Sequence, residues 1–119
     1  MSKYTKSIIT DETDICFICR RRGIALHWHH IAFGTSNRDN SEKYGLKVPL
    51  CMDCHEGNNG VHHNDELDLS LKQEAQKAFE ANVPQSAIDE YKLYSTKYDW
   101  KSEVEPRQVF IYIFGQSFL

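Results

Sequence analysis

All cysteines and histidines of this chain lie between Cys16 and His63, and residues 64–119 contain neither type. In chain order they form a Cys-x-x-Cys pair, an HWHH run, a second Cys-x-x-Cys pair and further histidines. The 4 cysteines and 6 histidines are more than one tetrahedral zinc ion can use. The surplus predicts a structural metal site and, beside it, a second site with a function of its own.

The two Cys-x-x-Cys pairs, Cys16/Cys19 and Cys51/Cys54, have the spacing of a structural zinc site. Each pair presents two thiolates from one tight turn, and two pairs complete a tetrahedron. A redox-active pair would need a helix N-terminus and would leave the other pair unexplained. Residues 1–10 are polar and lack the apolar region of a signal peptide, so we expect a cytoplasmic protein with reduced thiols.

Composition limits the partners that the chain can have. Its 119 residues suit one domain, and a hydrophobic content of 40% is low, so the polar first half is expected to need a metal ion for stability. No apolar stretch reaches the length of a membrane span. The net charge is −3, but residues 1–64 carry 8 Lys/Arg against 7 Asp/Glu and residues 65–119 carry 6 against 10. A polyanion would therefore meet the first half.

Turn residues and hydrophobic spacing divide the chain into strands followed by helices. A strand that carries histidines is expected within 24–33 and a second strand within 46–50, joined by a polar loop over 34–45. A short helix is expected at 52–56. Apolar spacing and proline or glycine positions predict longer helices over 65–81, 84–94 and 104–114, with Asn64 or Asp65 as the first N-cap, a loop over 95–103 and Gly115 after the last helix.

These elements predict an α+β fold with three regions: a flexible lead-in over 1–13, a zinc-braced domain over 14–80, and a helical extension over 81–119 that packs on the same core. The aromatic residues of the extension are expected to build that core. A docking face for a basic protein partner is the alternative, because the extension is acidic.

The histidines are the candidates for chemistry. His29 and His30 are neighbours on a strand, so their side chains point in different directions, and one can bind a metal ion while the other acts as a base. His55 and either His62 or His63 follow the second cysteine pair. The alternative, that all of these are surface or core residues without a ligand, fits poorly with their interleaving among the cysteines.

The motifs HHI at 29–31, VPLC at 48–51 and Cys54-His55 followed by His62 resemble the HNH endonucleases, also called ββα-metal or His-Me finger nucleases. The similarity is to small phage- and prophage-encoded members, including recombination-enhancement nucleases, and it spans roughly residues 14–80. It implies a zinc-braced ββα core, and the hydrophobic spacing adds two or three C-terminal helices.

The resemblance also implies roles for individual residues. His29 matches a ligand of a catalytic divalent ion, such as Mg²⁺ or Mn²⁺, and His30 matches the general base that activates water. His55 and His62 match histidines that complete the metal site, with His63 as the alternative to His62. His27 has no counterpart, and a supporting or surface role is expected.

The sequence departs from the family at the middle asparagine of the motif, where Leu46 stands. Asn37 and Asn40, in the preceding polar segment, are the candidates to replace it, with Asn37 as the catalytic residue that orients His30. The GNNGV segment after His55 is also longer than usual, which keeps both His62 and His63 open as ligands.

The implied activity is metal-dependent hydrolysis of DNA inside a bacterial host, in a phage or mobile-element setting. The basic residues expected to hold phosphates are Arg20, Arg21, Arg22 and Arg38. The alternative is a catalytically inactive HNH-like zinc module that binds DNA or a protein, for example as an accessory or inhibitor.

Overall fold

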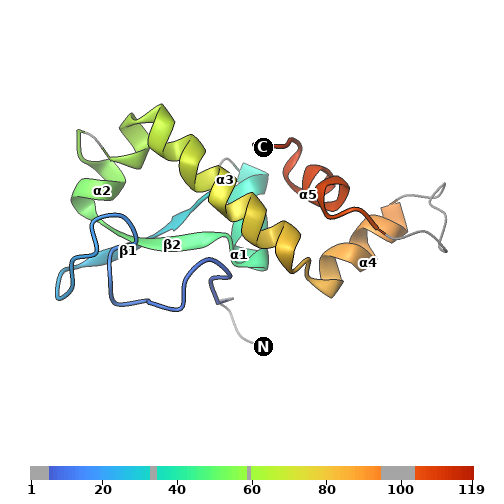
Figure 1. The fold of residues 1–119 in the computed structure, drawn as a ribbon, viewed down its shortest axis with the longest axis horizontal. Helices are drawn as coiled ribbons and strands as arrows, with labels where there is room; N and C mark the ends of the chain where they lie inside the picture. The colour runs from blue at the N-terminus through green and yellow to red at the C-terminus, as the bar shows by residue number, and fades with distance from the viewer. Residues whose placement is uncertain (1–5, 33–34, 59, 95–103) are drawn as a thin grey trace.

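The computed structural model describes residues 6–32, 35–58, 60–94 and 104–119. Within them the chain has an α+β fold with one two-stranded sheet and five α-helices (Figure 1). In chain order the elements are β1 (Leu26–His30), α1 (Thr35–Tyr44), β2 (Lys47–Cys51), α2 (Met52–Glu56), the 3-10 turn η1 (Val61–His63), α3 (Asp65–Ala81), α4 (Gln85–Tyr94) and α5 (Pro106–Phe114).

The two strands form an antiparallel hairpin, and both were expected from the sequence. The register places Leu26 opposite Cys51 and His30 opposite Lys47, so the histidine-rich strand runs beside the strand that leads into the second cysteine pair. All five residues of β2 are buried. Pro49 fits within it because a sheet of two strands has only edge strands, where a missing N–H is tolerated.

The connection between the strands is helical, and the prediction of a polar loop over 34–45 is wrong. Its sequence TSNRDNSEKY has no apolar stripe, so hydrophobic spacing could not reveal α1. Tertiary contacts stabilise it instead. Ser41 is fully buried; its hydroxyl donates to the carbonyl oxygen of Ala32 at 2.7 Å and accepts from the amide of the same residue at 3.1 Å. Tyr44 is buried as well.

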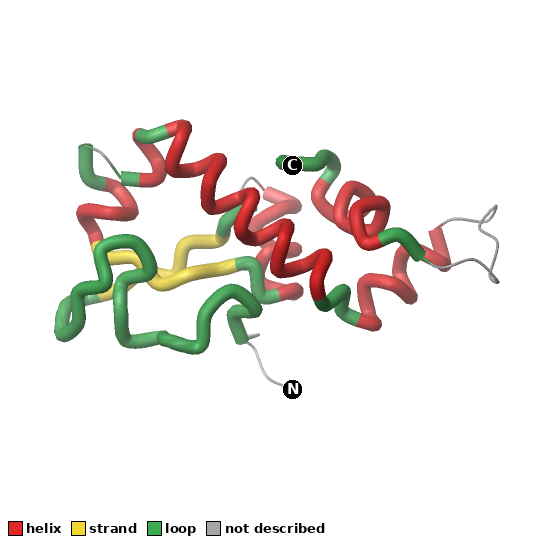
Figure 2. Tube along the Cα trace, in the orientation of Figure 1, coloured by secondary structure: helices red, strands yellow, loops and turns green. Residues whose placement is uncertain are grey.

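The long helix α3 crosses the molecule from the end of the hairpin toward α4 and α5 (Figures 1 and 2). Asn64 caps it as expected, because its side-chain oxygen accepts from the amide of Leu67 at 3.1 Å. The buried side chains of α3 recur at helical spacing and form one face: Leu71, Ala75, Gln76 and Phe79.

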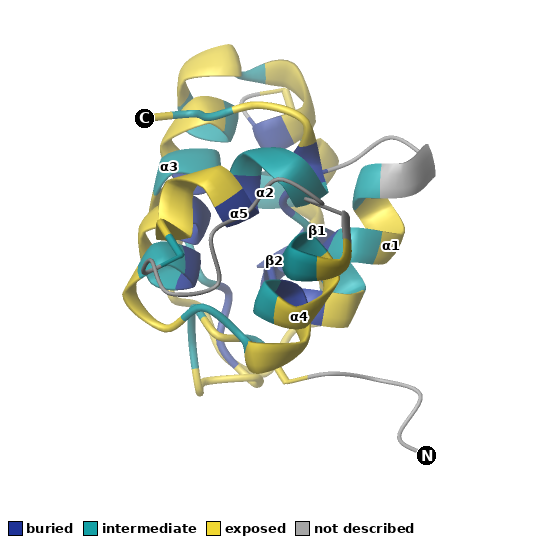
Figure 3. Cartoon of the chain, turned by 90° about the vertical axis from the view of Figure 1, so that its right-hand side faces the viewer, coloured by how far each residue is buried: buried dark blue, intermediate teal, exposed yellow. Residues whose placement is uncertain are grey.

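Phe79 joins the two halves of the core. Its ring lies at 6.1 Å from that of Tyr44 on α1 and at 5.4 Å from that of Phe110 on α5, both nearly perpendicular. A single cluster of buried side chains runs from Cys16 in the first half to Phe114 in α5. In Figure 3 the dark blue, buried parts of the ribbon lie mostly on the inner sides of the elements, and the yellow, exposed parts lie mostly outside. The C-terminal helices therefore share one core with the hairpin.

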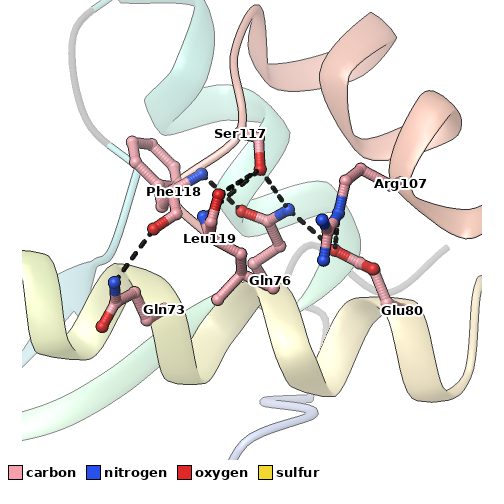
Figure 4. A network of polar contacts seen from close by, with 7 residues as sticks. All are labelled: Gln73, Gln76, Glu80, Arg107, Ser117, Phe118 and Leu119. Atoms are coloured by element: carbon pink, nitrogen blue, oxygen red, sulfur yellow. Dashed lines mark hydrogen bonds and ion pairs between the residues drawn. The ribbon is translucent and has the colours of Figure 1, made fainter.

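The chain after α5 folds back onto α3 (Figure 4). The helix ends at Phe114, and Gly115 follows it with a left-handed φ of 87°, as expected for the residue after a helix. The side chain of Gln76, fully buried, accepts from the amide of Phe118 at 2.6 Å and donates to the hydroxyl of Ser117 at 3.0 Å. Gln73 donates to the carbonyl oxygen of Phe118 at 3.0 Å. These bonds fix the C-terminus against α3.

The described part of the lead-in is attached to the hairpin and to the end of α1. In the lead-in, the hydroxyl of Ser7 donates to the carbonyl oxygen of Lys47 at 2.6 Å, and the amide of Ile8 donates to that of Gly45 at 2.9 Å. The expected loop over 95–103 lies outside the described residues. None of the described helices has both the length and the apolar content that crossing a membrane requires.

Candidate metal centres and the histidine recess

The first cysteine pair lies in a tight turn that is anchored to β2. Within the turn, the amide of Arg20 donates to the carbonyl oxygen of Cys16 at 2.9 Å, and Arg20 takes a left-handed φ of 67°. The amide of Phe17 donates to the carbonyl oxygen of Pro49 at 2.8 Å. This bond holds the turn against the strand that supplies the second pair.

The four thiols meet at one place. The Sγ atoms of Cys16, Cys19, Cys51 and Cys54 all lie within 4.8 Å of one another, and that of Cys19 is 3.8 Å from that of Cys51. Thiolates at tetrahedral positions around zinc are about 3.8 Å apart, given a Zn–S bond of about 2.3 Å. All four residues are described, and all are free thiols. The cluster can therefore hold a metal ion such as zinc.

The surroundings of the cluster favour the thiolate form at two of the cysteines, Cys16 and Cys19. Arg21 donates from Nε to the Sγ of Cys19 at 3.3 Å, which lowers the pKa of Cys19 to about 6. Burial acts to raise the pKa of Cys16, but bonds from backbone amides, first that of Cys51, outweigh it and the net pKa is lowered. Burial and the neighbouring thiols raise the pKa of Cys54. A metal ion would reverse this last effect, because it binds the deprotonated form.

The three adjacent arginines have partners within the protein. Arg21 also donates to the Sγ of Cys51 at 3.3 Å and to the carboxylate of Asp53 at 3.2 Å, so it supports the thiol cluster. Arg20 pairs with Glu12 at 2.7 Å and Arg22 pairs with Asp14 at 3.4 Å. Both of these pairs are exposed and contribute little stability, so a phosphate could compete for either arginine.

Three of the expected histidine ligands also meet. His29 of β1, His55 of α2 and His62 of η1 each offer a ring nitrogen, and these atoms lie within 4.8 Å of one another. The Nε2 atoms of His55 and His62 are 2.9 Å apart. His63 is exposed and does not belong to this group within the described part of the chain. Of the two alternatives, His62 is thus the one that lies in this group.

The glycine-rich segment after α2 brings η1 back onto that helix. The amide of Gly60 donates to the carbonyl oxygen of Gly57 at 2.8 Å, and the amide of Gly57 donates to that of Asp53 at 3.1 Å. A Cβ atom at Gly57 would lie 2.4 Å from the carbonyl oxygen of Asp53. Glycine is therefore required here for His62 to approach His55.

Two imidazoles of the cluster, those of His29 and His55, have lowered pKa values. Burial lowers the pKa of His29 to about 3, and the positive charges that His55 and His62 would carry lower it further. Burial lowers the pKa of His55 as well, and the charge that His62 would carry lowers it further. A neutral imidazole has the lone pair that a metal ion requires. His27, expected to have no direct role, stacks beside His55 with ring centres 6.1 Å apart.

His30 has a different environment from its neighbour. Its Nε2 atom lies 3.5 Å from the carboxylate of Glu42 on α1, and the same oxygen lies 2.7 Å from the Nζ of Lys47. Burial lowers the pKa of His30, and Glu42 opposes this shift. Sequence reasoning missed Glu42 because it had assigned this segment to a loop, and nothing in the sequence pairs Glu42 with His30.

The asparagines expected to orient His30 bind elsewhere. The side-chain amide of Asn37 donates to the carbonyl oxygen of Phe114 at 3.3 Å. The side-chain amide of Asn40 donates to the carbonyl oxygen of Ile113 at 3.0 Å. Both therefore tie α1 to the last turn of α5, in place of the expected role at His30. Leu46, at the position of the family's asparagine, is buried in the core.

His30 and the three clustered histidines open onto one recess of about 210 Å³ between the hairpin, α1, α2 and η1. The residues that line it are Trp28, His29, His30, Arg38, His55 and His62. Of the arginines expected to contact phosphate, Arg38 is thus the one at this recess. Comparison of the chain with models of protein families, with curated proteins and with solved structures returned no match.

Proposed function

We propose that this protein is a metal-dependent, HNH-type endonuclease that hydrolyses phosphodiester bonds in DNA. The observation that carries the proposal is the convergence of His29, His55 and His62 beside His30 and Arg38 on one recess. Hydrolysis of a phosphodiester requires parts of this kind: a group of imidazoles that can hold a metal ion, a separate imidazole with a carboxylate beside it, and a guanidinium.

In this proposal His30 is the general base. The carboxylate of Glu42 lies beside Nε2 and favours the tautomer that carries its proton there, which leaves the lone pair of Nδ1 to accept a proton from water. The lowered pKa of His30 keeps the ring neutral at physiological pH. Arg38 is exposed at the recess and would bind an oxygen of the phosphate.

The histidine cluster would hold the catalytic ion. When bound, a divalent ion there polarises the scissile phosphate and stabilises the charge on the leaving oxygen. Three imidazoles suit transition ions such as Zn²⁺, Ni²⁺ or Co²⁺ better than Mg²⁺, which prefers carboxylates and water. We therefore propose that Zn²⁺, Ni²⁺ or Co²⁺ supports cleavage at lower concentrations than the Mg²⁺ or Mn²⁺ expected from the family resemblance.

The thiol cluster has a supporting part in this scheme. Zinc bound by Cys16, Cys19, Cys51 and Cys54 would brace the hairpin against α2, and His55 follows Cys54 directly in the chain. The zinc would thereby fix the position of one ligand of the catalytic ion. This arrangement is the basis for describing the protein as a zinc-braced ββα nuclease.

A plasmid-nicking assay tests the proposal. Wild type, His30→Ala and His63→Ala are compared with Ni²⁺, Co²⁺, Mn²⁺, Mg²⁺ or EDTA. His63 is the matched control because it is exposed and lies outside the cluster. We expect nicking by wild type and His63→Ala, none in EDTA, and loss with His30→Ala. Equal nicking by all three proteins would contradict the assignment of His30.

A catalytically inactive module that binds DNA or a protein is the second candidate. It is favoured by the positions of Asn37 and Asn40, which are bound to α5, and by the acidic partners of Arg20 and Arg22. This candidate predicts binding of DNA or of a protein with no nicking under any metal ion.

A further inference from the structure

Trp28 is an exposed indole at the centre of the histidine-rich strand. It is 41% exposed and lies on β1 opposite Pro49. It lines the histidine recess and also a second recess of about 630 Å³. The other residues that line this second recess are Lys6, Ser7, Thr10, Asp11, Thr13 and Lys47. The two recesses therefore adjoin at one aromatic ring.

The indole is fixed in place. The Nζ of Lys47 lies 4.8 Å from the ring centre, in a cation–π contact. The Lys47 side chain is only 3% exposed and is bound to Glu42 at 2.7 Å, so it moves little. An isolated exposed aromatic residue is ordinary, but a ring held this way beside a recess is a preformed platform for stacking.

The wall of the second recess is also attached to the fold. Ser7 binds the backbone of Lys47, and the amides of Ile9 and Thr10 donate to the Ser7 hydroxyl at 3.1 and 3.3 Å. Hydroxyls, a carboxylate and two ammonium groups thus surround the aromatic ring of Trp28. A volume of about 630 Å³ is within the range of sites that bind small organic groups.

We propose that this second recess binds one unpaired nucleobase of the DNA substrate, stacked on Trp28, with the adjoining phosphate in the histidine recess. The inference rests on the proposed nuclease function, because the phosphate is placed at His30 and Arg38. A nucleotide joins a flat aromatic base to a phosphate, and the two adjoining recesses offer a flat ring and a phosphate site in the same order.

The substrate class follows from this geometry. A base inside a duplex is stacked on its neighbours and cannot also stack on Trp28 unless it leaves the helix. Single-stranded or branched DNA presents unpaired bases without that cost. The recess therefore favours cleavage at unpaired nucleotides, and Asp11, Thr10 and Thr13 are available to hydrogen-bond the edge of the base.

The test measures binding in the absence of cleavage. The His30→Ala protein is titrated against a fluorescein-labelled oligothymidine and against an abasic oligomer of the same length, by fluorescence anisotropy. Both have the same phosphates, but only the first has bases. The titrations are repeated with Trp28→Ala and with Trp28→Phe in the same background. Circular dichroism and zinc content check that each variant is folded.

Stacking of one base on an aromatic ring changes affinity roughly 5- to 150-fold. We expect Trp28→Ala to lose that factor for oligothymidine and to bind the abasic oligomer as its parent does. Trp28→Phe should retain most of the affinity, because a phenyl ring still stacks. Equal effects of Trp28→Ala on both oligomers would overturn the proposal, since the loss would then concern phosphates or folding. An affinity for oligothymidine that is the same with and without Trp28 would overturn it too.

The outcomes separate this inference from the nuclease function. Cleavage by wild type without base-dependent binding at Trp28 would leave the nuclease function in place and refute the base site. Base-dependent binding at Trp28 without cleavage by wild type would support the base site and point to the inactive module. If a basic or aromatic protein segment competes for Trp28 and oligothymidine does not bind, the recess is a protein-docking site and the inference fails.

Discussion

The thiol cluster and the histidine cluster lie in the same half of the molecule but differ in charge, number and setting. Four thiols, with Arg21 donating to two of them, can fill every position around a tetrahedral ion. Three imidazoles leave positions open, and they face a recess of about 210 Å³. The first arrangement suits an ion that holds the fold together, and the second suits an ion that meets a substrate.

The two clusters are also linked through the chain. Cys51 ends β2, Cys54 lies on α2, and His55 is the next residue. The turn that carries Cys16 is bound to β2 through Phe17. Loss of the thiol-bound ion should therefore displace the histidine cluster, whereas loss of the histidine-bound ion should leave the thiol cluster intact. Variants that remove one ion or the other can test this difference.

The largest expected effect comes from Cys51→Ser. Cys51 is buried and contacts the sulfur atoms of both cysteines of the first pair, so the variant should lose zinc and unfold the first half. Structural zinc sites supply about 10–16 kcal/mol of apparent binding energy to folding. Elemental analysis and thermal unfolding measure both losses. His55→Ala is the counterpart and should retain about one zinc per chain. Zinc-free Cys51→Ser with a native melting curve would refute the structural role.

Within the histidine recess, His29→Ala and His30→Ala should fail in different ways. Removal of the base should lower kcat about 10²- to 10⁴-fold, with no recovery at high metal concentration. Removal of a ligand should weaken metal affinity, so part of the rate should return as the ion is raised. Metal titrations of nicking rates compare the two variants. Parallel responses would mean that the neighbours do not divide the roles as proposed.

Because the imidazole of His29 is buried, the stability of the protein should fall in acid when the histidine cluster holds no metal ion. Its pKa is about 3 in the folded protein and about 6.5 in an unfolded chain. Above pH 6.5 the ring is neutral in both states, so stability is unaffected. Below pH 6.5 the unfolded chain takes up the proton first, and the free energy of unfolding should fall by about 1.4 kcal/mol per pH unit toward pH 3.

Urea unfolding of the zinc-loaded protein, with the histidine cluster free of metal, at pH 7.0 and 5.5 measures this fall. His29→Gln is the control, because glutamine fills similar space and does not titrate in this range. A wild type that loses no more stability than His29→Gln between these pH values would show that His29 is not held neutral by burial.

The smallest expected effect is that of Glu42→Gln. Loss of the carboxylate removes the group beside the Nε2 of His30 and the partner of Lys47. We expect kcat to fall about 10-fold with little change in KM, as for other groups that orient a functional side chain. Glu74→Gln, on the exposed side of α3, is the matched control. Unchanged kcat in Glu42→Gln would leave the orientation of His30 without an explanation.

The sequence predicted those parts of the fold that have a local signal. Turn residues marked both strands, and Asn64, Pro84 and Gly115 marked helix ends that the structure confirms. The paired thiols could be predicted because Cys-x-x-Cys spacing is itself the local signal. The meeting of His29, His55 and His62 came from a resemblance, and the geometry brings these residues together.

The rest depends on contacts that are distant in sequence. Helix α1 has no apolar stripe. Its stability comes from Ser41 and Tyr44, which are buried in the core, and from the hydrogen bonds that its residues Asn37 and Asn40 donate to α5. Its position in turn decides that Glu42 lies beside His30. No spacing rule could reveal this pair, because it follows from the packing of an unrecognised helix on the hairpin.

The central claim is that one cluster holds a structural ion and the other an exchangeable, functional ion. Brief treatment with EDTA, followed by zinc analysis, circular dichroism and the nicking assay, tests it most directly. We expect activity to disappear while the spectrum and about one zinc per chain persist, and we expect added Ni²⁺ or Mn²⁺ to restore nicking. Loss of fold in step with loss of activity, or nicking that survives the treatment, would contradict the claim.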